Sequence, residues 1–310
     1  VNPTELLRAY LEFHRPDVLR GNITAQAGRM TLDVGSRRFV ARNRFRNTIN
    51  SFTGIDINWH GSKKLADMHL RGFWALPVVR LPDTADQLFH NNIVFDEESF
   101  DLQLWGIFAA NNFAKFGRGE LFIFGLHEQD TSNRLTQNRQ LFTPGFRLFR
   151  TPASASIDYE FESAFQMGQS HTSPVAPRTL DHFAHFHHLT AGYTFSTAWT
   201  PRIAVLYDFA SGDNNPDDGN NGRFDTLYSA RRFDFGPTGI YGALARTNMH
   251  APGMRLNLKP HNRLTASMDY RALWLASSRD AWGFTGVRDP DGRSGSFVGS
   301  QLDAQIQWQL

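Results

Sequence analysis

Residues 301–310, QLDAQIQWQL, alternate strictly between polar and apolar side chains. In an extended strand, Leu302, Ile306 and Trp308 would point to one side, and Gln305 and Gln307 to the other. A period of two is typical of a strand with one apolar and one polar face, and it excludes an amphipathic helix. The end of the chain is therefore predicted to be a strand about ten residues long.

The same alternation recurs along the whole sequence. It is strong at 157–168, 201–209 and 264–274, and weaker at 7–13, 53–60, 65–75, 100–108, 121–126, 183–195 and 254–259. Polar, Gly-rich or Pro-rich turns separate these segments, which together predict about 14–16 strands. Strands of about 9–11 residues match the hydrocarbon thickness of a bilayer and exceed the mean strand of a soluble domain.

The composition fits a membrane-spanning sheet. Aromatic residues make up 13% of the chain although its mean hydropathy is only −0.41, which suits strands that are apolar on alternate positions only. The longest apolar runs, 73–79 and 104–110, are far shorter than the roughly 18 residues of a spanning helix. Charges on the polar faces need water or one another. We therefore expect an all-β, transmembrane antiparallel β-barrel with an aqueous lumen, and take a soluble sandwich or barrel as the alternative.

Domain organisation and compartment follow from the same features. No linker or shift in composition divides the chain, so residues 1–310 are treated as one barrel domain. Because residue 1 is Val and no leader pattern opens the chain, we expect any signal peptide to have been removed or left out. Strand patterns begin and end almost at the ends of the chain, so we expect strands to be missing on both sides. The chain has no cysteine, so neither a disulfide framework nor a thiolate metal site is available. Its net charge of +2 argues against nucleic-acid binding through bulk charge.

Arginines are concentrated at residues 35–47, GSRRFVARNRFRN. If this segment is extended, Arg38, Arg42, Arg44 and Arg46 lie on one face. Guanidinium groups bind carboxylates through paired donors, so a stripe of them in a lumen would attract polyanions. Further lumenal cations are expected at Arg71, Arg202, Arg255, Lys259 and Arg271. As an alternative, the arginines form ion pairs across strands with acidic residues, namely Asp56, Asp67, Asp158, Glu160, Glu162 and Asp208.

Two stretches carry distinctive motifs, namely residues 27–59, with the Gly28–Arg29 pair and the arginine-rich turn, and residues 207–228, YDFASGDNNPDDGNNGRFDTLY. Both stretches resemble the alginate export porin family. The resemblance implies a barrel of about 18 strands that passes an anionic polysaccharide through an arginine-rich constriction. It suggests Arg29, Arg38 and Arg42 as constriction residues. The acidic face at Asp158, Glu160 and Glu162 departs from that picture and leaves the identity of the polymer open.

Other chemistry was weighed against these patterns. Asp213, Asn215 and Asp217 occupy alternate positions, as in a calcium loop, but Asp218 and Phe224 stand where an EF-hand needs Gly and Glu. Of the clustered histidines His182, His185, His187 and His188, only His185 and His187 are predicted to share a strand face, and no further ligand completes a zinc set. No G-x-S-x-G sequence marks a hydrolase.

The sequence therefore predicts an outer-membrane channel that passes an alginate-like anionic polysaccharide by passive diffusion through an arginine-lined pore. It predicts no enzymatic activity and no cofactor. Membrane lipid, the polysaccharide and periplasmic secretion proteins are the expected partners. A general anion or small-carbohydrate porin is the first alternative, and an outer-membrane barrel hydrolase is the alternative from another class.

Overall fold

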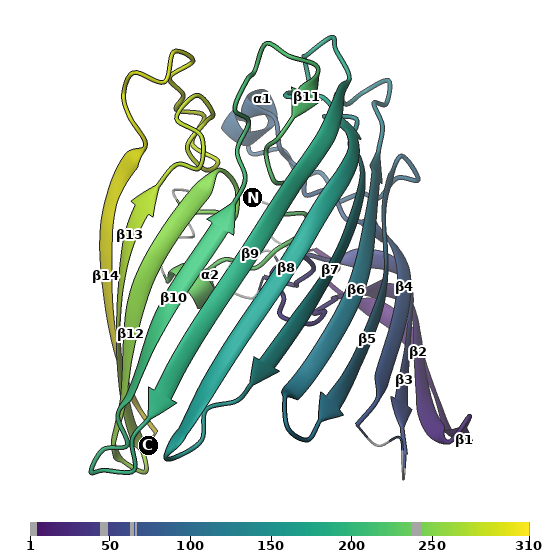
Figure 1. Cartoon of the computed structure of the whole chain (residues 1–310). Helices are drawn as coiled ribbons and strands as arrows, with labels where there is room; N and C mark the ends of the chain where they lie inside the picture. Colours follow the sequence, from purple (N-terminus) through teal and green to yellow (C-terminus); the bar gives the residue numbers. More distant parts are fainter. Residues whose placement is uncertain (1–4, 44–48, 63–64, 66, 237–243, 310) are drawn as a thin grey trace.

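A computed structural model describes residues 5–43, 49–62, 65, 67–236 and 244–309 (Figure 1). Thirteen strands follow one another in a single sheet in chain order, each antiparallel to its neighbours, and a short fourteenth strand, β11, pairs with β9 in parallel. The strands are β1 Ala9–Val18, β2 Gly21–Met30, β3 Phe52–Gly61, β4 His69–Pro77, β5 Leu102–Phe113, β6 Gly117–Glu128, β7 Gln140–Arg150, β8 Ser156–Ser170, β9 Leu180–Thr194, β10 Arg202–Ala210, β11 Asn220–Asn221, β12 Met249–His261, β13 Leu264–Trp274 and β14 Phe297–Trp308. Two short helices, α1 Ala85–Phe89 and α2 Arg232–Phe235, lie in loops.

The connections differ between the two ends of the sheet. Tight turns at 19–20, 114–116 and 262–263 join the strands at one end, and long segments at 31–51, 78–101, 211–248 and 275–296 join them at the other (Figure 1). Outer-membrane barrels carry short turns on the periplasmic side and long loops on the extracellular side. The end with the long loops is therefore assigned to the cell exterior.

The two faces of the sheet divide as the alternation predicts. Ile157, Phe161, Ile203 and Leu302 are exposed on the convex face, whereas their neighbours point inward. The all-β class and the facing of β8, β10, β13 and β14 are thus confirmed. Strands β2 and β7 were not among the patterns picked out from the sequence, because Ala and Gly on β2 and Pro144 and Gly145 on β7 dilute the alternation.

Two extracellular loops fold into the barrel and bind each other there. Val40 of the first loop forms a parallel bridge with Tyr228 of the second, and the Ala41 N–H donates to the Tyr228 carbonyl oxygen at 2.9 Å. The ring of Phe39 packs against Phe122 and Phe186 of the wall, with centroids 5.2 and 5.6 Å apart. Part of the lumen is therefore a packed apolar core, which the expectation of a polar inner face did not include.

The condition of an extended segment at 35–47 is not met by residues 35–43, and residues 44–47 lie outside the described part of the chain. Residues 35–39 form turns and bends, and Val40 makes an isolated bridge. Arg37 has a positive φ of 69°, a conformation that interrupts any strand. The apolar Phe39, Val40 and Ala41 are all buried, so this segment has no arginine face opposed to an apolar face.

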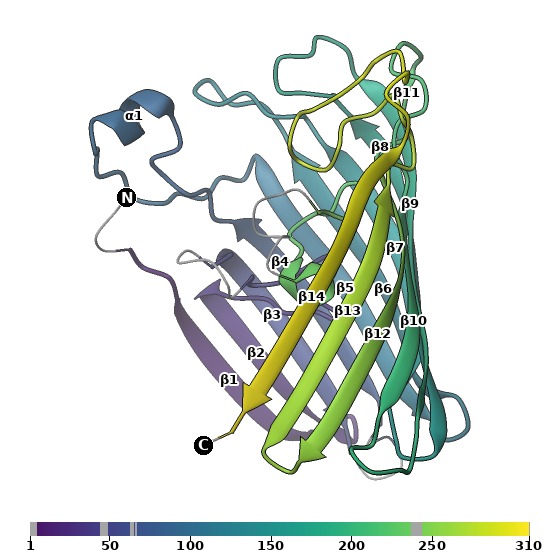
Figure 2. The same ribbon diagram turned by 90° about the vertical axis from the view of Figure 1, so that its left-hand side faces the viewer.

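The sheet curls around these loops, and its first and last strands come to opposite sides of an opening (Figure 2). Within the described residues no hydrogen-bonded register joins β1 to β14. Among the same residues no helix is long and apolar enough to cross a membrane. The predicted additional strands stay a prediction.

Candidate functional site

Arg38 is the centre of an ion-pair network between the inward loop and β8. Its Nη1 donates to Glu162 Oε2 at 2.5 Å and also pairs with Glu160. Its Nε donates to Asp234 Oδ2 of α2 at 2.8 Å. Three carboxylates from two distant parts of the chain thus surround one buried guanidinium. Such a site is stable only while all members are present, because a lone buried charge is costly.

Asp234 also forms an ion pair with a second arginine, Arg246, from its own loop. Arg246, which is fully buried, pairs with Asp234 Oδ2 and donates through Nη1 to the Ala230 carbonyl oxygen at 2.8 Å. Burial alone would raise the pKa of Asp234, but Arg38 and Arg246 hold that pKa well below its usual range. The carboxylate is therefore ionised at every physiological pH.

Three arginines on strands also form pairs in the lumen. Arg71 Nε donates to Asp56 Oδ1 at 2.7 Å, Arg202 Nε to Asp158 Oδ2 at 2.8 Å, and Arg271 Nη1 to Asp208 Oδ2 at 2.5 Å. These are the cross-strand pairs of the alternative hypothesis. A paired guanidinium still has free N–H donors, so pairing alone does not prevent a role in substrate contact.

Arg29 lies on the opposite face from the one predicted. It is paired in register with Thr53 of β3, beside Ile55, which is exposed on the convex face. Its Nη2 donates to Glu98 Oε2 at 2.5 Å. The constriction role suggested for Arg29 is therefore wrong. On β2 both faces carry small or polar residues, so the sequence there does not indicate which one is inside.

The remaining predicted site residues lie in different places and do not form a common group. Arg42 forms an ion pair with Asp33, with Nε and Oδ2 3.0 Å apart. Arg44 and Arg46 lie outside the described residues. Asp67 accepts a hydrogen bond from Asn112 Nδ2 at 2.9 Å near the periplasmic turns and has no arginine partner in the described part of the chain.

A cavity of about 450 Å³ lies between the inward loops and β7 to β13. We call it the arginine cavity, because seven arginines and only three acidic residues line it. The arginines are Arg37, Arg38, Arg147, Arg150, Arg202, Arg255 and Arg271, and the acids are Asp158, Glu160 and Asp234. Thr151 and Pro152 of the β7–β8 turn also line it, so the cavity reaches the periplasmic end of the barrel.

A second cavity, of about 740 Å³, lies against β12, β13 and β14. We call it the mixed cavity, because three arginines and four aspartates line it. They are Arg37, Arg42 and Arg255, and Asp33, Asp234, Asp269 and Asp303. Arg37, Phe233, Asp234 and Arg255 line both cavities, so the two adjoin at the inward loops.

Arg37 is the residue that the sequence argument missed. Its guanidinium lies 5.0 Å from the centroid of the Phe233 ring, and it forms no ion pair with any described residue. The strand hypothesis placed Arg37 on the face away from Arg38. Both side chains reach the same cavity because the backbone turns here.

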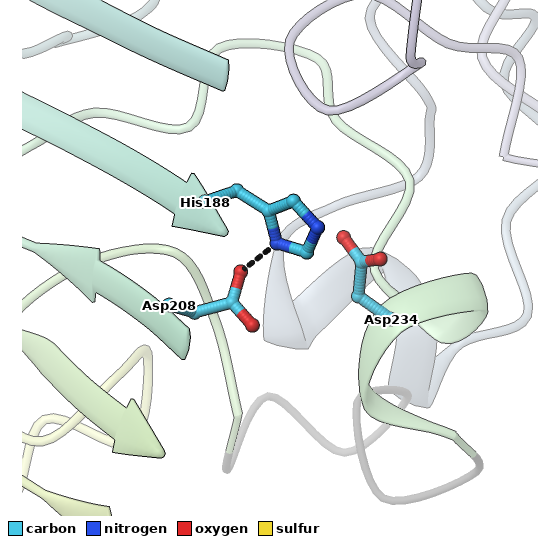
Figure 3. Close-up of side chains that lie close together, drawn as sticks. All are labelled: His188, Asp208 and Asp234. Atoms are coloured by element: carbon cyan, nitrogen blue, oxygen red, sulfur yellow. Dashed lines mark hydrogen bonds and ion pairs between the residues drawn. The ribbon is translucent and has the colours of Figure 1, made fainter. Parts of the chain in front are cut away.

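His188, Asp208 and Asp234 form the one group of metal-ligating side chains found among the described residues, with ligand atoms within 4.8 Å of one another (Figure 3). His188 Nδ1 and Asp208 Oδ1 are 2.7 Å apart. The other Asp208 oxygen binds Arg271, and both Asp234 oxygens bind Arg38. A divalent cation would have to displace these guanidinium groups, so the donor set does not fit a metal.

The histidines of β9 divide between its two faces. His182 and His188 point inward and are buried, whereas His185 and His187 point outward. The prediction that only the second pair shares a face is wrong, because positions 182 and 188 differ by an even number.

The loop at 213–217 is the segment whose Asp and Asn residues at alternate positions were compared with a calcium loop. Here the Asn215 N–H donates to Asp213 Oδ1 at 3.3 Å, and burial raises the pKa of Asp213.

A serine–histidine contact lies on the lipid-facing wall. Ser163 Oγ is 2.9 Å from His187 Nδ1, and His187 Nε2 is 3.0 Å from His185 Nδ1. Ser163 is only 2% exposed, so its hydroxyl is covered. Neither imidazole meets a carboxylate within the described residues, so this contact lacks the orienting acid of a hydrolase triad.

The fold of this chain was compared with those of known proteins. The crystal structure of OccD3 (OpdP) from Pseudomonas aeruginosa matches with a TM-score of 0.51 at 13% identity, over 93% of this chain and 65% of that chain. The chain thus spans less than two thirds of the matched chain's length, and the likeness concerns the fold alone. None of the curated proteins matches. The fold, the apolar outer face and the unequal loops define the class of the protein, a bacterial outer-membrane β-barrel.

The family is shown by a second comparison. The alginate export family model matches residues 1–310, and the chain belongs to that family. It is therefore a protein of the bacterial outer membrane.

Proposed function

We propose that this channel passes an anionic, uronate-bearing polysaccharide of the alginate type by passive diffusion, with no bond chemistry. The observation that carries the proposal is the arginine cavity, in which seven guanidinium groups face three carboxylates. A guanidinium binds a carboxylate through two parallel N–H donors. A polymer with a carboxylate on each sugar would find several such donors along one cavity.

Arg37 is the residue we propose as the principal substrate contact. It lines both cavities, and no described acid neutralises it. A polymer that moves from the arginine cavity into the mixed cavity would therefore stay within reach of Arg37. Because conduction requires binding that is strong enough to enter and weak enough to leave, an acidic wall beyond the cationic one would favour release.

We propose that the complete channel has more strands than those described. The edges of β1 and β14 carry backbone groups without a strand partner in the described part of the chain. Unpaired strand edges are not viable in lipid, so we propose that further strands complete the wall and that residues 1–310 lie within one barrel. Periplasmic secretion proteins would then deliver polymer at the end with the short turns, where the arginine cavity lies.

The test is the reversal potential of the full-length protein in a planar bilayer with a KCl gradient, with and without polymannuronate. We expect anion selectivity and block by the polymer, and we expect Arg37→Gln to weaken both. Arg293→Gln is the matched control, because Arg293 is exposed in an extracellular loop. Cation selectivity, or indifference of the wild type to polymannuronate, would reject the polyanion channel.

The two alternatives give different results in the same experiment. A general anion or small-carbohydrate porin would conduct chloride selectively without block by the polymer. A hydrolase would release fatty acid or sugar from a lipid or glycan, and that activity would disappear in Ser163→Ala. Ser163 is the test position because of its contact with His187.

A further inference from the structure

The loop between β4 and β5, residues 78–101, folds against the outside of the barrel wall. Its Glu98 accepts hydrogen bonds from Arg29 Nη2 at 2.5 Å and from Thr53 Oγ1 at 2.9 Å. Both donors belong to the convex faces of β2 and β3. Figure 2 shows α1 of this loop to one side of the sheet, apart from the loops above β8 to β13. The loop therefore lies outside the lumen, at the extracellular end of the wall.

This loop exposes large apolar side chains. Phe89 is 86% exposed, Phe95 67% and Phe100 69%, and Ile93 is exposed as well. Single exposed apolar residues are ordinary, but a cluster of this size on one segment marks an interaction surface. The exposed acids Asp83 and Asp86 stand near the start of the same loop, so the segment has both an apolar and a polar part.

The apolar part of the loop is continuous with the lipid-facing surface of the barrel. The ring of Phe100 stacks on Trp74, with centroids 6.0 Å apart and an interplanar angle of 30°. Trp74 is on the convex face of β4, as is Leu70, which is exposed. Aromatic side chains on this face form the belt at a membrane interface. The occupant that this continuity favours is lipid.

We propose that loop 78–101 is a membrane-surface anchor that rests on the outer leaflet. Phe89, Ile93, Phe95 and Phe100 would enter the boundary between headgroups and acyl chains, where amphipathic segments bury their apolar side. The contact of Glu98 with Arg29 and Thr53 holds the base of the loop against the wall and sets its direction. This inference depends on the outer-membrane location and not on the identity of the transported solute.

Spin labelling tests the depth of the loop. Because the chain has no cysteine, Phe95→Cys in the full-length protein gives a single attachment site for a nitroxide. In phosphatidylcholine vesicles we expect frequent collisions with oxygen and few with a water-soluble nickel chelate. Val175→Cys, in the exposed β8–β9 loop, is the control and should give the reverse. Frequent nickel collisions at 95 would overturn the proposal, and so would low accessibility to both reagents, which would mean that protein covers the loop.

A second variant tests the role of the Glu98 contact. Glu98→Gln in the Phe95→Cys background should increase nitroxide mobility and reduce oxygen collisions at 95, because Arg29 loses its ion pair with this loop and keeps only the longer one to Glu5. Glu97→Gln, one residue away, is the matched control and should change neither. Bilayer conductance should stay unchanged in both. Unchanged mobility and depth in Glu98→Gln would show that this contact does not position the loop.

Discussion

The arginine cavity and the mixed cavity adjoin and share Arg37, Phe233, Asp234 and Arg255, yet they differ in charge. The arginine cavity is lined by seven arginines and three acidic residues, an excess of four arginines. The mixed cavity is lined by three arginines and four aspartates, an excess of one aspartate. Several arginines of the first cavity are paired with acids that do not line it, such as Glu162 and Asp208. The charge that a lumen presents therefore depends on which member of each ion pair faces the water.

This difference also separates structural from functional arginines. Arg38 is fixed by three carboxylates and holds the inward loops to β8. Arg37, the preceding residue in the chain, has no such partners among the described residues and lines both cavities. Adjacent arginines of the same motif are thus expected to have opposite effects when changed, one on stability and the other on selectivity.

Arg38→Gln should have the largest effect of the changes considered. It leaves Glu162 and Asp234 without their shared cation, and breaking a buried pair in this way costs about 3–5 kcal/mol. We expect a lower thermal unfolding temperature and a larger single-channel conductance as the inward loops detach. Arg150→Gln is the control from the same cavity, because Arg150 is exposed and has no ion pair among the described residues. Equal stability of the two variants would remove the distinction between structural and functional arginines.

The pH dependence of the loops should follow Asp234. Its pKa is well below the usual value because Arg38 and Arg246 stabilise the charged form. A depressed pKa gives stability that is present above the unfolded pKa of about 3.9 and is lost as pH falls through the folded value. We therefore expect conductance to stay constant from pH 7 to about pH 4 and to rise only in stronger acid.

Asp234→Asn supplies the comparison for that titration. It should lower stability already at pH 7 and show a smaller further loss in acid, since the linked carboxylate is gone. His188 and Asp208, which lie beside Asp234 (Figure 3), are further titratable neighbours. A rise in wild-type conductance between pH 7 and pH 5 would assign the pH response to a group other than Asp234.

Asp303→Asn should have the smallest effect and should make the two cavities more alike. Asp303 lines the mixed cavity and accepts a hydrogen bond from Gln301. It forms no ion pair with any residue that the structure describes, so no ion pair is lost. The mixed cavity would then have equal numbers of arginines and aspartates. We expect a modest shift of the reversal potential toward anions, smaller in high salt because of screening. Asp291→Asn, in an exposed loop, should leave the potential unchanged.

Much of the fold could be predicted from the sequence because a membrane imposes a regular pattern. Strands β8, β10, β13 and β14 alternate between a lipid-facing and an inward side, and each was found with the right facing. Patterns were weaker at β4 to β6 because Phe73, Leu104, Phe122 and Phe124 are apolar but point inward, toward the loops. An alternation with a period of two is visible only in strands whose two faces differ in polarity.

The site was predicted less well, because it depends on where loops fold. Arg29 was assigned to the lumen and lies outside, and Arg38 was assigned to a strand and lies in a turn. Arg37 was not selected at all, although it stands within the quoted motif. A period of two assigns residues to the two faces of a strand. It does not apply to residues 35–43, which form no continuous strand.

The sequence alone determined the all-β class, the facing of the regular strands, the abundance of arginine and acid on the inner side, and the family. These follow from local alternation and from the motifs at 27–59 and 207–228. Only the tertiary structure decided which arginines are neutralised and which face open cavities. Those contacts join residues far apart in the chain, such as Arg38 and Asp234, and they form only when two loops fold into the same lumen.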